Sequence, residues 1–132
     1  MDISELSSKI IGAAIEVHRA LGPGALGPGL LESVYEECLY HELDLQGMSF
    51  ERQKPLTVTY KGKNLECGYR LDLVVEKEII LELKSCENIE PIHRAQLLTY
   101  LKLSGLHLGL ILNFNVPVMK NGVVRVVNKL PE

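Results

Sequence analysis

Apolar residues recur along this chain with two periods, one typical of helices and one typical of strands. Spacings of three and four residues predict helices at 3–21, at about 30–46 and at 90–103. Runs rich in β-branched and aliphatic residues predict strands at 49–54, 56–60, 65–75, 79–84, 106–114 and 123–127. The order of two helices, four strands, a helix and two strands predicts an α/β fold, with helices surrounding a mixed sheet built on a hairpin.

Glycine and proline separate the predicted elements. Gly22-Pro23 should end the first helix, Gly47 the second, and Lys61-Gly62-Lys63 should form a turn. Residues 21–30 carry a five-residue unit twice, first as Leu-Gly-Pro-Gly-Ala and then as Leu-Gly-Pro-Gly-Leu. Two copies do not make a repeat architecture, so we interpret them as a lengthened turn. Nothing divides the chain, and we expect one domain over residues 1–132.

Charged residues interrupt two neighbouring strand-like runs, 69–76 and 79–84. Side chains alternate along a strand, so Glu82 and Lys84 should share one face while the leucines beside them share the other. A turn near Lys77-Glu78 allows an antiparallel hairpin, which would bring Asp72 beside Glu82. Two carboxylates and a lysine at the end of an apolar hairpin are costly to bury unless a cation or a substrate uses them.

This group has the chemistry of a metal site. Mg²⁺ takes oxygen ligands and often binds through only one or two carboxylates, which Asp72 and Glu82 would supply beside the backbone carbonyl of Leu83. Lys84 could orient an attacking water or help to deprotonate it. The alternative is a salt bridge across the hairpin, with Lys84 paired to one of the carboxylates.

Glu32 is a further acidic candidate, at the start of the second predicted helix. A glutamate in the first turn of a helix is favoured by the helix dipole, and this alone would explain its position. The functional interpretation is a third acidic group that reaches the metal directly or through water.

The third predicted helix carries polar residues at helical spacing. His93, Gln96 and Tyr100 are three and four residues apart and should share one face. Gln96 and Tyr100 could hydrogen-bond a nucleic-acid backbone or a metal-binding carboxylate, and His93 and Arg94 could meet phosphates. The alternative is a solvated polar stripe opposite the apolar positions Leu97, Leu98 and Leu101.

Composition narrows the partners. The net charge is −3, so nucleic-acid binding would need a local basic surface, a metal that offsets the acidic residues, or a partner. The three cysteines are too few for an iron–sulfur cluster, which needs about four thiolates. No apolar run is long enough to span a membrane and no basic leader precedes one, so we expect a cytoplasmic protein.

The ordered set Glu32, Asp72, Glu82-x-Lys84 and Gln96-x-x-x-Tyr100 resembles the PD-(D/E)xK nuclease superfamily, and its last element resembles the motif of RecB-type nucleases. More narrowly, residues 17–24, 29–35 and 96–102 resemble a small bacterial and archaeal family named for a GxxExxxY pattern. The spacing of the pattern would place its tyrosine at position 36. In this sequence Glu36 occupies that position and the tyrosine is Tyr35.

The resemblance implies a restriction-endonuclease-like core in which Asp72 and Glu82 bind Mg²⁺ or Mn²⁺, Lys84 assists the water and Gln96 lies near the active site. It also implies phosphodiester hydrolysis in DNA. The alternative is a catalytically silent nuclease fold that binds nucleic acid, regulates or assembles. A homodimer could form through the strand at 106–114 or the N-terminal helix.

Overall fold

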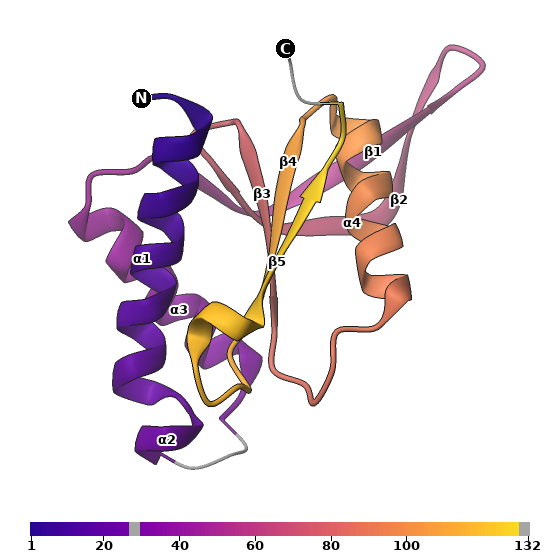
Figure 1. Ribbon diagram of the computed structural model, residues 1–132. Helices are drawn as coiled ribbons and strands as arrows, with labels where there is room; N and C mark the ends of the chain where they lie inside the picture. Colours follow the sequence, from indigo (N-terminus) through magenta and orange to yellow (C-terminus); the bar gives the residue numbers. More distant parts are fainter. Residues whose placement is uncertain (27–29, 130–132) are drawn as a thin grey trace.

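The computed structural model describes residues 1–26 and 30–129 and contains a five-stranded sheet with helices on both faces (Figure 1). The strands lie side by side in chain order: β1 (Phe50–Tyr60), β2 (Lys63–Val75), β3 (Ile79–Lys84), β4 (Leu108–Asn113) and β5 (Val123–Val127). The helices are α1 (Ile3–Leu21), α2 (Pro23–Leu26), α3 (Glu32–Leu45), α4 (Pro91–Ser104) and the 3₁₀ helix η1 (Met119–Gly122).

The sheet is mixed, as the sequence predicted. β3 and β4 run parallel, while the other neighbouring pairs run antiparallel. A parallel pair needs a crossover, and α4 provides it between β3 and β4. The carboxyl ends of β3 and β4 therefore meet at one edge of the sheet, where the chain also enters α4.

Two apolar cores cover the two faces of the sheet. Helices α1 and α3 pack on one face, against side chains such as Leu81, Leu83 and Leu110. Helix α4 packs on the other face, where Leu97 and Leu101 meet Ile80 and Ile111. In Figure 1, α1 and α3 accordingly lie on the left of the sheet and α4 on the right.

Local chemistry sets the ends of α1. The carboxylate of Asp2 accepts a hydrogen bond from the Glu5 N–H at 2.8 Å, which caps the first turn. At the other end the Gly22 N–H donates to the His18 carbonyl at 2.7 Å. A Cβ atom on Gly22 would lie 2.5 Å from that carbonyl oxygen, so the close approach requires glycine.

Most predicted elements are confirmed, and β3 and β5 match their predicted ranges. The strands predicted at 49–54 and 56–60 are one strand, β1, because its pairing with β2 continues past Pro55 with a register shift. Proline has no N–H to donate to the ladder, which explains why it lies at the irregularity. Lys63 belongs to β2 rather than to the turn, and the short α2 was not predicted.

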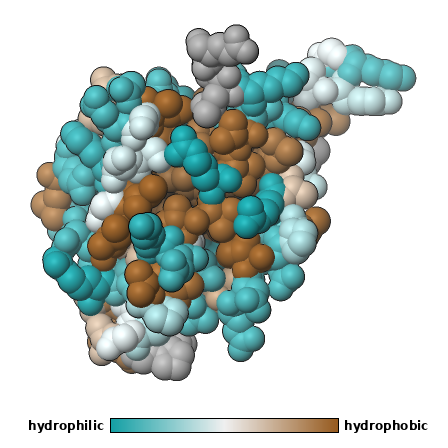
Figure 2. All heavy atoms as spheres, viewed as in Figure 1, coloured by the Kyte–Doolittle hydropathy of each residue, from teal (hydrophilic) through white to brown (hydrophobic). Residues whose placement is uncertain are grey.

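The described part of the chain contains no helix that is long and apolar enough to cross a membrane. Of the two predicted dimer surfaces, β4 lies between β3 and β5, and all its residues are buried. Exposed apolar side chains instead lie on α1 and at the sheet edge formed by β5, for example Ile15 and Val127. Figure 2 shows hydrophobic surface in this region.

Candidate active site at the end of the β2–β3 hairpin

Asp72 and Glu82 lie where β2 and β3 separate. The two strands pair from Val75 with Ile79 to Leu73 with Leu81, so Asp72 and Glu82 would be the next pair in register. The regular pairing stops there. Instead, Oδ2 of Asp72 accepts a hydrogen bond from the Leu83 N–H at 2.9 Å. The hairpin was predicted correctly, and its open end holds both carboxylates.

The surroundings of Glu82 disfavour the ionised form of its carboxyl group. Its Oε1 atom is buried and has no hydrogen-bond partner in the part of the chain that the structure describes. Burial of the carboxyl and, after it, the negative charge of Asp72 raise the pKa of Glu82 to about 9. The positive charge of Lys84 acts in the opposite direction. A buried polar atom without a partner is costly, so this oxygen is free to accept a cation or a proton.

Lys84 shares the face of Glu82, as the alternation predicted. Leu81 and Leu83 are fully buried, whereas Glu82 and Lys84 are only partly buried. The ion pairs among the described residues are Arg19–Glu16, Arg52–Glu37 and Lys54–Glu51, and none involves Lys84. The salt-bridge alternative therefore lacks a direct contact, while the charge of Lys84 still acts on both Glu32 and Glu82.

Glu32 lies close to the same charges. It is the first residue of α3. Although Glu32 is exposed, partial desolvation of its carboxyl raises its pKa. Lys84 lowers this pKa, Asp72 raises it and the nearby Ser85 backbone lowers it. The Ser85 hydroxyl donates to the Leu30 carbonyl at 3.4 Å. This bond connects the chain just before α3 with the chain just after β3. The second copy of the duplicated loop unit lies partly outside the described residues.

Tyr100 is buried, which corrects the alternative of a fully solvated polar stripe on α4. Its ring packs in the core with Leu97 and Leu101, because most of a tyrosine side chain is apolar. Burial raises the pKa of Tyr100, and the negative charges of Glu82 and Asp72 raise it further. The tyrosine is therefore near enough to the carboxylate pair to feel its charge, whereas Gln96, one turn earlier, is exposed and lines the same cleft.

The other polar residues of α4 differ in their surroundings. Nδ1 of His93 accepts a hydrogen bond from the Glu90 N–H at 2.9 Å, so this ring closes the first turn of the helix. Arg94 beside it is exposed.

Sequence reasoning missed Asn113, at the carboxyl end of β4. This buried amide accepts from the Cys86 N–H at 3.2 Å and donates to the Cys86 carbonyl at 2.9 Å. It thereby holds the chain just beyond Lys84. A single polar residue at the end of the apolar run 108–113 was the signal that could have revealed it.

Tyr35, the tyrosine of the displaced pattern, has a packing role. It is buried, its hydroxyl donates to the Leu21 carbonyl at 3.2 Å, and its ring stacks on Phe114 with centroids 4.5 Å apart. It joins α3 to the end of α1 and to the chain that follows β4.

The carboxylates of Asp72 and Glu82 meet some of the requirements of a site for a divalent cation. Among the described residues, no group of three or more histidine, cysteine, aspartate or glutamate side chains is arranged to hold a metal ion. Mg²⁺ nevertheless often binds through one or two carboxylates and keeps several waters. Asp72 and Glu82 supply two carboxylates, and the unpaired Oε1 of Glu82 is the kind of ligand atom that such an ion would satisfy.

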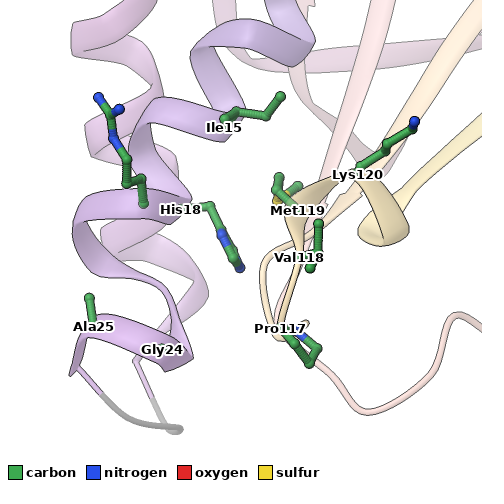
Figure 3. Close-up of a pocket in the computed structure, with 9 residues that line it drawn as sticks. Ile15, His18, Gly24, Ala25, Pro117, Val118, Met119 and Lys120 are labelled. Carbon is green, nitrogen blue, oxygen red and sulfur yellow. The ribbon is translucent and has the colours of Figure 1, made fainter.

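A cavity of about 450 Å³ lies apart from these residues, between the end of α1, α2 and residues 117–120 (Figure 3). His18 points toward the loop, and its Nε2 donates to the Val116 carbonyl at 2.6 Å. The lining is mostly apolar and includes no residue of the carboxylate group. We interpret this cavity as part of the junction that fixes the chain after β4.

Comparison with protein families gives a match to the PD-(D/E)XK nuclease superfamily over residues 4–126. Neither the curated proteins nor the solved structures gave a match. The mixed sheet with flanking helices is consistent with the restriction-endonuclease-like fold of this superfamily. Because the match covers nearly the whole chain, this protein belongs to the PD-(D/E)XK nuclease superfamily.

Proposed function

We propose that this protein is a divalent-metal-dependent nuclease that hydrolyses phosphodiester bonds in DNA. The observation that carries the proposal is the unpaired, buried Oε1 of Glu82 beside Asp72. Two carboxylates held together in this way without a cation force one of them to keep a proton. A cation relieves that repulsion. Its positive charge also reduces the repulsion between the acidic site and an approaching phosphate.

Each site residue has a proposed role. Asp72 and Glu82 would hold Mg²⁺ or Mn²⁺, with Glu32 and the Leu83 carbonyl as further ligands. When bound, the ion supplies positive charge that polarises a phosphoryl oxygen and makes water more acidic. Lys84 would orient the attacking water and stabilise the negative charge that develops on the phosphate.

The helix α4 would position the substrate. Gln96 is exposed beside Tyr100 and can donate and accept hydrogen bonds, while Tyr100 feels the charge of the carboxylates. Arg94 would contact a phosphate, and His93 would do so through Nε2, because its Nδ1 is already bonded to Glu90. We further propose membership of the narrower GxxExxxY family, supported by residues 17–24, 29–35 and 96–102.

Cleavage of single-stranded and double-stranded DNA with Mg²⁺ or Mn²⁺ tests the proposal. Lys84→Ala and Asp72→Ala should abolish metal-dependent cleavage, whereas Lys61→Ala, at the exposed tip of the β1–β2 hairpin, should leave it unchanged. Cleavage that persists in the first two variants would remove this mechanism.

A nuclease fold without turnover is the second candidate. The net charge of −3 and the lack of a three-ligand group among the described residues favour it. Calorimetric titration with Mn²⁺ separates the candidates: binding without cleavage supports a silent module, and absence of binding counts against both.

A further inference from the structure

A cleft of about 260 Å³ opens between β2 and α4, on the side of the sheet that Tyr100 covers. Its lining includes Tyr69 from β2 and Gln96, Thr99 and Tyr100 from α4. The volume lies below the roughly 300–1,000 Å³ of common small-molecule sites and suits a single flat ring. Sequence reasoning gave no role to Tyr69.

The cleft keeps apolar surface in contact with solvent. Tyr69 is 47% exposed and Ile92, also in the lining, is 67% exposed. The rings of Tyr69 and Tyr100 have centroids 6.0 Å apart and are tilted by 55°. The Tyr100 ring is therefore buried, while much of the Tyr69 ring is open to solvent. The open Tyr69 ring is available to a ligand with a π face.

Tyr100 connects the cleft to the carboxylate pair, because the same residue lines the cleft and feels the charges of Glu82 and Asp72. Tyr69 also precedes Asp72 by three residues in β2. That separation corresponds to about 10 Å along a strand. A ligand in the cleft would thus lie close to the carboxylates of the proposed active site.

The chemistry of the lining suits a nucleobase. An aromatic face stacks on any base, so such a contact tolerates every sequence. The Gln96 amide offers two donors and an acceptor for the edge of a base. The Thr99 hydroxyl donates to the Ala95 carbonyl at 3.1 Å, which leaves its oxygen as an acceptor. In a duplex both faces of a base are covered by its neighbours, so only an unpaired base can enter.

We propose that this cleft receives an unpaired nucleobase from the DNA strand, with Tyr69 as the stacking surface, and that the protein therefore prefers single-stranded or frayed DNA. This inference rests on the proposed function for its choice of substrate. Binding itself does not depend on turnover, so the two can be tested separately.

The test is the binding of a single-stranded oligothymidine carrying one 2-aminopurine, measured by fluorescence with Ca²⁺ in place of Mg²⁺. Stacking on Tyr69 should quench the 2-aminopurine. Tyr69→Ala should relieve the quenching and weaken binding at least about fivefold, the lower end of what one stacked base contributes. Tyr69→Phe keeps the ring and should retain both signals.

A matched control is available in the same chain. Tyr60 is 61% exposed at the tip of the β1–β2 hairpin and does not line the cleft, so Tyr60→Ala should change neither signal. Ala95 lines the cleft from an exposed helical position, and Ala95→Leu should fill it and weaken binding without removing a ring. Blunt duplex of the same length should bind wild type and Tyr69→Ala equally.

Three results would overturn the inference. The first is that the oligothymidine does not bind, and the second is that neither Tyr69→Ala nor Ala95→Leu changes the quenching. The third is that Tyr69→Ala weakens binding of the duplex as much as binding of the single strand. Cleavage with Tyr69-independent binding would refute the inference and leave the proposed function standing. If binding depends on Tyr69 but neither the wild type nor any variant cleaves DNA, the proposed nuclease activity is refuted. The proposed binding of a nucleobase in the cleft is then supported.

Discussion

The carboxylate of Asp72 accepts the backbone N–H of Leu83 at 2.9 Å, at the point where the ladder between β2 and β3 ends. A side chain thus takes over a hydrogen bond that the opposing strand would otherwise satisfy. The strands can separate there without leaving this buried donor unpaired. The opening lies beside Glu82 and Lys84, so the aspartate both shapes the site and supplies charge to it.

Replacing Asp72 with asparagine should separate these two roles. The amide oxygen of Asp72→Asn can still accept from Leu83, so the midpoint of urea unfolding should change little. Metal-dependent cleavage should fall by roughly 100-fold or more, as when a group that acts on transition-state charge is removed. Asp72→Ala loses the hydrogen bond as well and should be less stable by about 1 kcal/mol. Equal stability of the two variants would contradict the structural role.

The raised pKa of Glu82 predicts how stability depends on pH. The pKa is about 9 in the folded protein against an ordinary value of 4.5, so between these values the folded state holds a proton that the unfolded state has released. The metal-free protein should therefore lose stability as pH rises from about 5 to 9, by at most about 1.4 kcal/mol per pH unit from this group. Denaturant unfolding at several pH values measures the slope.

Glu82→Gln is the control for that slope, because the amide cannot ionise and the contribution of Glu82 should vanish. Saturating Mn²⁺ should also reduce the slope in the wild type, since a bound cation displaces the proton. A slope that is the same in wild type and Glu82→Gln would show that Glu82 does not titrate in this range.

Gly22→Ala should destabilise the protein. Its new Cβ would lie 2.5 Å from the His18 carbonyl oxygen and close to the His18 ring, which itself bonds Val116. Relief of such a clash typically costs about 1–3 kcal/mol. The matched control is Gly24→Ala, because a Cβ there meets nothing within 4 Å. Thermal unfolding should show a lower midpoint for Gly22→Ala than for Gly24→Ala.

Asn113→Ala should weaken the support of Lys84. The substitution leaves the partly buried N–H and carbonyl of Cys86 without their amide partner, which costs about 1–3 kcal/mol in the free energy of unfolding. We also expect slower cleavage, since the chain beyond Lys84 is held less firmly. Asn121→Ala, at an exposed position, should affect neither measurement.

The sequence alone located three long helices and the strands β3 and β5, because hydrophobic periodicity depends only on neighbours along the chain. It also assigned Glu82 and Lys84 to one face of β3 and placed Asp72 beside Glu82 in a hairpin, since strand alternation and a short turn determine register. The order of the polar motifs indicated the superfamily that the family comparison then showed.

The tertiary structure alone decided what surrounds these residues. The end of the β2–β3 ladder at Asp72, the unpaired oxygen of Glu82, the burial of Tyr100 and the support from Asn113 all depend on segments far apart in sequence. The open face of Tyr69 belongs with them, because it depends on where α4 crosses the sheet. Local pattern specifies which face a side chain takes, but burial and unmet hydrogen bonds arise only when distant elements pack.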